Sequence, residues 1–161
     1  MIPDVNVLVA ASRTDHPQYA AASAWLKTAL RECASGTSFR LLPMVVASHL
    51  RLVTNPKIFA APTPVKDAIG FIDSLLAVPE VDMPAIGTEW PLLRQWCLDK
   101  KLAANALPDA WLAAAVVQLG DHLVTFDAGF KHLLRRGQFT LLTGTQIGTP
   151  PRRMKPIQPS S

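Results

Sequence analysis

The chain has 161 residues, 49% of them hydrophobic and 17% charged, which predicts one globular domain with a sizeable core. Its net charge of +4 does not by itself indicate nucleic-acid binding, because three basic residues without acidic neighbours, Arg152, Arg153 and Lys155, leave only +1 on residues 1–150. Two isolated cysteines favour reduced thiols over a disulfide framework or a zinc site. No signal peptide is readable, and no apolar run approaches the roughly 20 residues of a membrane span, so we expect a cytoplasmic protein.

Short strands and longer helices alternate from the start of the chain. Residues 1–3 are expected to form a very short strand, and residues 16–34 an amphipathic helix that ends before Gly36. A second strand is predicted over residues 39–42.

A helical hairpin is predicted over residues 44–78. Its first helix begins at Pro43 and ends before Pro56, and Thr63 is expected to cap the second helix, which runs over residues 65–78. Its apolar side chains exceed what a two-helix excursion buries easily in its own domain, so we expect them to form a homodimer interface. These side chains are Phe59, Ile69, Phe71, Ile72, Leu75 and Leu76.

The second half of the chain continues the alternation. The expected elements are a strand over residues 80–86, a helix over 88–101 capped by Thr88, a helix over 109–120, a buried strand over 123–125, a short helix over 128–134 and a last strand over 139–142. This order predicts an α/β fold with a mostly parallel sheet. We take residues 1–143 as one domain and residues 144–161 as a flexible tail that is rich in proline and basic residues.

Three aspartates lie where one predicted element meets the next. Asp4 ends the first strand, Asp127 follows the buried strand over residues 123–125, and Asp109 begins a helix. In an open parallel sheet, side chains at the carboxyl ends of neighbouring strands converge. Two carboxylates about 4 Å apart repel by about 4 kcal/mol at an effective dielectric of about 20, whereas a helix N-terminus offsets only about 0.3–1 kcal/mol. A bound cation would relieve this repulsion, and oxygen ligands favour Mg²⁺.

Such a cation acidifies a bound water and stabilises charge on a phosphodiester, which is the chemistry of nucleic-acid hydrolysis. Asn6 and Thr125 lie two residues from Asp4 and Asp127 and are expected to hold the acids or the water in place. Each aspartate also has a structural interpretation, with Asp109 as a helix cap and Asp127 as a turn or cap residue. Asp4 is the hardest to explain in this way, because an unpaired charge among apolar neighbours is costly to bury.

Four stretches resemble the PIN-domain ribonucleases and, within them, the VapC-type toxins of toxin–antitoxin modules. They are residues 4–10, 51–56, 108–114 and 124–130, and they occur in family order. The resemblance implies a three-layer α/β/α fold with a five-stranded parallel sheet, RNA cleavage that depends on Mg²⁺ or Mn²⁺, and inhibition by a cognate antitoxin. It makes Asp4 and Asp109 the principal metal ligands, with Asp127 in the same cluster and Asn6 and Thr125 in support.

The chain departs from this family at Ser48, where a glutamate is common three residues before the arginine that corresponds to Arg51. Serine brings no charge, and we expect its hydroxyl to bind a metal-held water or a phosphate. Arg51 is expected to contact RNA phosphate or to pair with an acid at the site, the alternative being a solvated helix face. The missing glutamate leaves a second function open, a PIN module that binds RNA or antitoxin without turnover. A phosphatase or phosphoacceptor domain fits less well, because Asn6 stands where a second aspartate would be needed.

Histidines and tryptophans receive structural predictions. No tight ligand spacing links the four histidines, so we expect capping, surface or packed roles for His16, His49, His122 and His132. The tryptophans are expected mostly in the core rather than as base-stacking platforms. They are Trp25, Trp90, Trp96 and Trp111.

Overall fold

The computed structural model describes residues 1–144, and its strands form two parallel sheets. β1 (Ile2–Pro3), β4 (Leu123–Thr125) and β5 (Phe139–Leu141) pair in the order β1-β4-β5, and β2 (Phe39–Arg40) pairs with β3 (Val81–Asp82). Every strand pair in the described part of the chain is parallel, which confirms the predicted α/β class.

The expected continuous five-stranded sheet is not observed, and Pro3 provides the reason. β2 lies beside β1, since Arg40 N donates a hydrogen bond to the carbonyl of Met1 at 2.9 Å. The next bond of a parallel ladder would need an N–H on Pro3, which proline does not have. Pairing between β1 and β2 therefore stops after this bond, and the strands divide into sheets of three and two.

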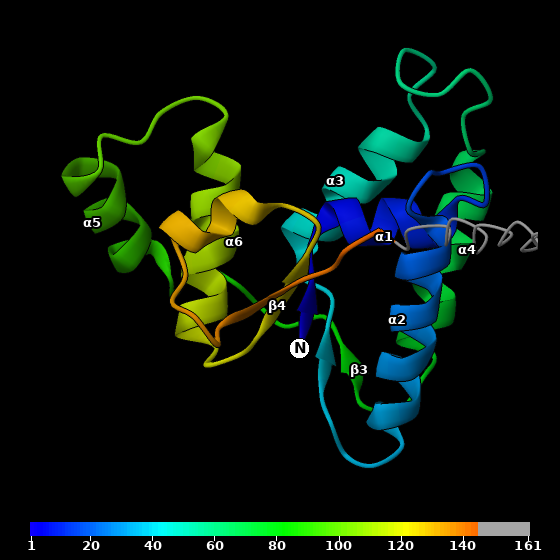
Figure 1. Ribbon diagram of the computed structural model, residues 1–161, viewed down its shortest axis with the longest axis horizontal. Helices are drawn as coiled ribbons and strands as arrows, with labels where there is room; N and C mark the ends of the chain where they lie inside the picture. Colours follow the sequence, from blue (N-terminus) through cyan, green and yellow to red (C-terminus); the bar gives the residue numbers. More distant parts are fainter. Residues whose placement is uncertain (145–161) are drawn as a thin grey trace, which may run out of the picture.

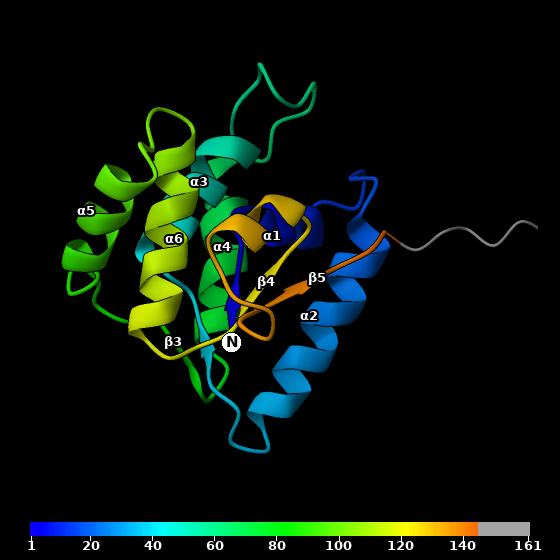
Figure 2. The same ribbon diagram turned by 60° about the vertical axis from the view of Figure 1, so that its left-hand side comes forward.

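Helices cover the strands from two sides. They are α1 (Val5–Ser12), α2 (Tyr19–Cys33), α3 (Pro43–Val53), α4 (Val65–Leu76), α5 (Trp90–Asp99), α6 (Ala106–Gln118) and the 3₁₀-helix η1 (Ala128–His132). α5 and α6 lie together on one side of the strands and α2 on the other (Figures 1 and 2). Beyond its first residue, the predicted tail over 144–161 lies outside the described residues.

Helix α1 is missing from the predicted elements, and its composition explains the omission. Its eight residues are nearly all apolar, and the whole run from Val7 to Ala10 is buried. α1 packs against both α2 and α3, so it has no broad polar face to produce a helical periodicity. Because α1 begins directly after Asp4, this helix sets the position of the first aspartate.

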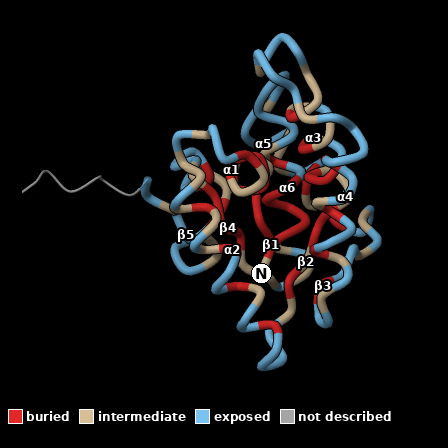
Figure 3. Tube along the Cα trace, turned by 90° about the vertical axis from the view of Figure 1, so that its right-hand side faces the viewer, coloured by how far each residue is buried: buried red, intermediate tan, exposed pale blue. Residues whose placement is uncertain are grey.

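The core lies along the strands and the inner helices, where the buried segments of Figure 3 gather. Its largest buried side chains include Ile2 of β1, Phe39 of β2, Leu123 of β4 and Phe130 of η1. Small residues such as Ala113 let α6 pack close to this core. None of the helices within residues 1–144 has the length and apolar composition needed to cross a membrane.

The predicted helical hairpin exists as α3 and α4, but its own domain covers most of its apolar side chains. Ile72 and Leu75 are only 4% and 3% exposed, because α4 packs on α3 and β3. Of the six residues expected at a homodimer interface, Ile69 alone is strongly exposed, at 44%. The premise of a large uncovered apolar surface on this hairpin is therefore wrong.

Two predicted helix caps are also wrong. Pro64 occupies the N-cap position of α4, and the Thr63 hydroxyl instead accepts a hydrogen bond from Arg13 Nη1 at 2.9 Å. At α5 the N-cap position belongs to Glu89, one residue after Thr88. Arg13, which is distant in the sequence, thus binds the Thr63 hydroxyl that the local sequence predicts as the cap of α4.

Candidate active site

Asp4 is fixed at the turn between β1 and α1. Its extended backbone makes it the N-cap of α1, and Oδ1 accepts a hydrogen bond from Val5 N at 2.6 Å. Oδ2 accepts hydrogen bonds from Asn6 Nδ2 at 2.8 Å and from Thr125 Oγ1 at 2.6 Å. Only 4% of Asp4 is exposed. The carboxylate is thus held by its own turn and by the neighbouring strand.

Asn6 and Thr125 connect α1 to the end of β4. Asn6 Nδ2 donates a second hydrogen bond, to Thr125 Oγ1 at 3.1 Å, and Asn6 Oδ1 accepts one from Phe126 N at 3.1 Å. Thr125 Oγ1 also accepts a hydrogen bond from Asp127 N at 2.9 Å. Both residues lie where the sequence predicts support for the acids, and their effect on activity stays a prediction.

Asp127 follows β4 and caps η1. Its Oδ1 accepts a hydrogen bond from Gly129 N at 2.6 Å, and the residue is exposed. A Cβ at position 129 would lie 3.0 Å from that oxygen, so glycine permits this close turn. The capping interpretation of Asp127 is therefore correct, and the capping hydrogen bond occupies one of its carboxylate oxygens.

Asp109 approaches the site from α6. The helix begins three residues earlier, at Ala106, and its N-cap is Asn105. Asp109 is thus a half-buried residue of the first helical turn and does not cap the helix. Its position near the helix N-terminus favours its ionised form.

The carboxylates disfavour each other's charge. Burial raises the pKa of Asp4 to about 6, and the negative charges of Asp109 and Asp127 add to this, although hydrogen bonds from Thr125 and Val5 oppose it. Burial also raises the pKa of Asp109, and the charge of Asp127 contributes. The three acids therefore act on one another electrostatically across β1, β4 and α6, as their positions in the sequence predict.

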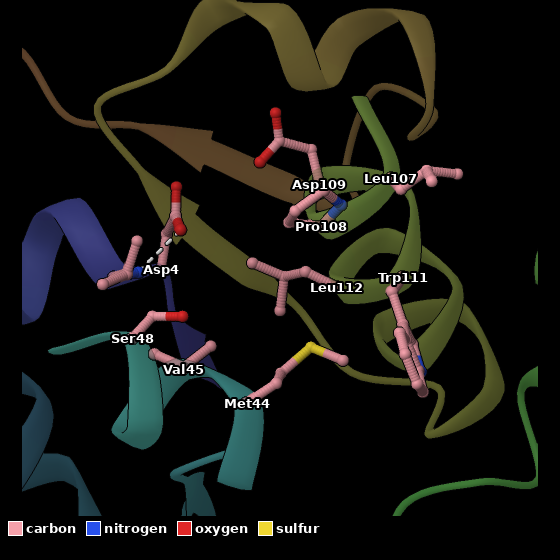
Figure 4. A pocket seen from close by; sticks show the side chains of 10 residues that line it. Asp4, Met44, Val45, Ser48, Leu107, Pro108, Asp109, Trp111 and Leu112 are labelled. Atoms are coloured by element: carbon pink, nitrogen blue, oxygen red, sulfur yellow. Dashed lines mark hydrogen bonds between the residues drawn. The ribbon is translucent and has the colours of Figure 1, made fainter. Parts of the chain in front are cut away.

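A cleft of about 240 Å³ brings Asp4, Ser48 and Asp109 together. Figure 4 shows Asp4 at the end of α1, Ser48 on α3 and Asp109 on α6 facing this space from three sides. The remaining lining is mostly apolar: Val5, Met44, Val45, Leu107, Pro108, Trp111 and Leu112. Arg51 is exposed and does not line the cleft, so the structure does not bring it to the acids.

The donor atoms fit a divalent cation that keeps much of its water. Within residues 1–144, no three His, Cys, Asp or Glu side chains are grouped so that they could hold one ion directly. Asp4 and Asp109 nevertheless present two carboxylates to one cleft, and Mg²⁺ is commonly held by one or two carboxylates and several waters. Hydrogen bonds to Asp4 use only part of the lone-pair capacity of its oxygens. The two carboxylates in this cleft therefore fit such a cation, and Asp127 does not line the cleft.

Two of the four tryptophans are exposed, so the prediction that they lie in the core is half wrong. One of them also makes a hydrogen bond that the sequence does not predict. Trp90 and Trp111 are 58% and 42% exposed, although both were expected in the core. Trp111 Nε1 donates a hydrogen bond to Glu89, whose side chain is almost fully buried. No local pattern signals this contact, because it joins residues 22 positions apart.

Parallel strands with aspartates at their carboxyl ends, braced by an asparagine and a threonine, define a PIN-like α/β domain. No family model matches the chain. It is 36% identical to Ribonuclease VapC25 of Mycobacterium tuberculosis over 128 residues, which cover 79% of this chain and 88% of that protein. Ribonuclease VapC31 of the same organism is 35% identical over the same shares. The chain therefore belongs to the VapC ribonuclease family.

Solved structures show the same fold at low sequence identity. The crystal structure of VapBC2 from Rickettsia felis, bound to a DNA fragment from its promoter, matches with a TM-score of 0.59 and 16% identity over 88% of this chain and 98% of that chain. Mycobacterium tuberculosis VapC20, described as a sarcin–ricin loop cleaving toxin, matches with a TM-score of 0.56 and 15% identity over 81% and 92%. The fold is thus that of VapC toxins.

Proposed function

We propose that this protein is the toxin of a toxin–antitoxin pair and an endoribonuclease that depends on a divalent metal. The observation that carries the proposal is the convergence of Asp4 and Asp109 on one cleft, in a chain of the VapC ribonuclease family. When bound there, Mg²⁺ or Mn²⁺ would supply an acidified water and stabilise the charge that develops on an RNA phosphodiester.

The residues of the chain divide the remaining work. Asp4 and Asp109 hold the cation, and Asn6 and Thr125 keep Asp4 in one orientation through its Oδ2. Asp127 adds negative charge at the rim, where a water can connect it to the ion. Ser48 offers a neutral hydroxyl to a metal-held water or to a phosphate oxygen of the substrate.

The proposed partners of the protein are an antitoxin, RNA and a second copy of the chain. We propose that a cognate antitoxin binds this chain and blocks the cleft, and that the protein works in the cytoplasm. Arg51 lies outside the cleft and is exposed, so its proposed role is to contact RNA phosphate away from the cleaved bond. We keep a homodimer as part of the proposal, with Val65 and Ile69 as the exposed apolar residues of α4.

RNA cleavage tests the proposal directly. Purified protein freed of antitoxin is incubated with RNA in EDTA, in Mg²⁺ and in Mn²⁺, beside Asp4→Asn and Asp109→Asn variants. Cleavage is expected with either metal, none in EDTA, and a loss of at least about a hundredfold in each variant. Activity that survives when Asp4→Asn and Asp109→Asn are combined in one protein would refute the mechanism.

The serine at position 48 supports one alternative, a module that binds RNA or antitoxin without turnover. The same assay separates the two functions, because tight RNA binding without products in any divalent metal would favour the alternative. Ser48→Ala refines the result. Unchanged metal affinity and unchanged cleavage in this variant would rule out a role for the hydroxyl.

A further inference from the structure

The cleft that contains the acids extends away from them into an uncharged, apolar end. Of its ten lining residues only Asp4 and Asp109 are charged, and Figure 4 shows both at one end, with Met44 and Trp111 at the other. When one group of a ligand binds near the acids, the adjoining part of that ligand can occupy the apolar end, which suits an uncharged group.

At that apolar end, Trp111 is fixed by a hydrogen bond to a buried side chain, which a partly exposed tryptophan does not need. The residue is 42% exposed, so water could satisfy the indole N–H. The N–H instead donates to Glu89, which is only 2% exposed and which also accepts a hydrogen bond from Gly87 N at 2.7 Å. This hydrogen bond to a buried carboxylate restricts rotation of the indole, while the residue stays partly exposed.

We propose that Trp111 is a stacking platform for one unpaired nucleobase of the RNA, beside the bond that is cleaved, and that Glu89 is the positioning residue for its ring. The inference rests on the proposed ribonuclease function. A nucleobase is the uncharged, flat group that a single-stranded RNA carries next to each phosphate. Aromatic rings bind such bases by stacking without needing a particular base.

The cleft favours this occupant over a charged one. Val45, Leu107 and Leu112 also line the cleft, and none of their side chains offers a hydrogen bond or a charge. Trp111 lines the cleft, and its indole N–H is already used by Glu89, so the ring has only its π-system to offer a bound group. Recognition there depends on stacking and shape, and the platform should accept more than one base.

The test distinguishes the effect of the Trp111 ring from a general effect of replacing an exposed tryptophan. Trp111→Leu keeps an apolar side chain but removes the π-face, and Trp90→Leu is the matched control, since Trp90 is 58% exposed and does not line the cleft. The probe is a short fluorescent single-stranded oligoribonucleotide that carries a cleavage site mapped with the wild-type protein. We expect Trp111→Leu to raise KM by about tenfold with kcat changed by less than about twofold, and Trp90→Leu to change neither.

Changing the substrate tests the same contact without altering the protein. An abasic nucleotide is introduced on each side of the cleaved bond in turn. At one of these positions the wild-type KM should rise by about tenfold, whereas Trp111→Leu should show no further increase, because the stacking partner is already gone. Glu89→Gln, which keeps an oxygen acceptor for the indole, should retain a near wild-type KM, and Glu89→Leu should resemble Trp111→Leu.

Independent, multiplying effects of the abasic site and of Trp111→Leu would overturn the proposal, and so would a change confined to kcat. If Trp111→Leu cleaves RNA like the wild type but is no longer inhibited by its antitoxin, the apolar end binds protein and the proposal is wrong. A wild-type protein that cleaves no RNA refutes the ribonuclease function first and this inference with it.

Discussion

Asp4 stabilises the fold and also opposes it. As the N-cap of α1 it accepts a hydrogen bond from Val5 N, a contribution of about 0.5–2 kcal/mol in other helices. Burial and the charges of Asp109 and Asp127 raise the pKa of Asp4 to about 6, so its ionised form is disfavoured in the folded protein. The same residue that starts the helix therefore costs stability at neutral pH until a cation or a proton neutralises it.

Asp4→Asn should make the stability of the metal-free protein less sensitive to rising pH. Because the pKa of Asp4 rises from 3.8 to about 6 on folding, its favourable contribution is complete below about pH 3.8 and is lost as the pH rises through about 6. Asparagine keeps one capping oxygen without the charge, but its amide nitrogen replaces Oδ2 and cannot accept the hydrogen bonds from Asn6 and Thr125. Between about pH 4 and about pH 7.5 in EDTA, the free energy of urea unfolding of the variant should therefore improve relative to the wild type by up to about 3 kcal/mol, on top of a loss that does not depend on pH. An equal difference at both pH values would contradict this account.

His49 is the second buried group whose ionisation opposes folding. It is fully buried on α3, with Nε2 at 3.0 Å from Ser12 Oγ, and Nδ1 has no hydrogen-bond partner in the described residues. Burial lowers the pKa of His49 to about 4. Its contribution to stability is therefore complete above about pH 6.5 and is lost as the pH falls through about 4.

His49→Gln should reduce the acid sensitivity of the fold. The free energy of unfolding should fall less between about pH 6.5 and about pH 4 than in the wild type, by up to about 3 kcal/mol, because glutamine takes up no proton in that range. His132→Gln is the control, since His132 is exposed. Urea unfolding at several pH values measures the effect. Identical pH profiles for both variants would show that His49 is not the group responsible.

Much of the acid site could be predicted from individual residues. Asp4, Asn6 and Thr125 meet because they end or follow strands that pair directly, and local sequence already suggests such junctions. The exposure of Trp111 and its contact with Glu89 could not be predicted, because they depend on how a distant segment crosses α6. Arg51 is exposed and does not line the cleft, and its contact with RNA stays a prediction, since a polar helix face does not show in which direction it points.

The loop between α3 and α4 is held by an arginine from the end of α1. Arg13 is 7% exposed, and its guanidinium donates to Thr63 Oγ1 at 2.9 Å and to the carbonyl of Ala61 at 3.0 Å. It also forms a two-bond pair with Asp15 and lies 3.8 Å from the centre of the Phe59 ring. One side chain thus connects the α1–α2 turn to the α3–α4 loop.

Arg13→Met should loosen that loop while leaving the acid site in place. Methionine keeps an apolar stem but loses the bonds to Thr63 and Ala61, so we expect a loss of about 2 kcal/mol in the free energy of unfolding. Limited proteolysis should cut faster within residues 55–63. Arg13→Lys is the matched control for charge and should recover only part of the loss, because lysine lacks the planar fork. Unchanged protection of the loop in Arg13→Met would show that the arginine does not hold it.

Several elements were placed well from the sequence. The limits of β4 were predicted correctly, and α2, α3 and α6 were placed within three residues at each end. α1 was missed because helices cover it on more than one side, which removes the periodicity that identifies a helix. The hairpin of α3 and α4 was found, but the burial of its apolar face depends on packing against β3, which local sequence does not reveal.

The molecule as a whole is a parallel α/β domain whose acids come from three separate parts of the chain. The order of elements predicts this class, because alternating strands and helices force parallel pairing. The division into sheets of three and two was not predicted, since it results from one missing N–H on Pro3. Family membership and the cleft geometry then point to the same end of the sheet as the functional one.

Manganese binding tests the central claim most directly, because it asks whether the crowded carboxylates hold an ion. Titration of metal-free protein with Mn²⁺, followed by electron paramagnetic resonance of the free ion, should show one site at about pH 7.5. Affinity should fall by about tenfold at about pH 5, since a pKa of about 6 leaves Asp4 largely protonated there. Asp4→Asn and Asp109→Asn should each weaken binding by at least about tenfold. Wild-type affinity in both variants would contradict the account.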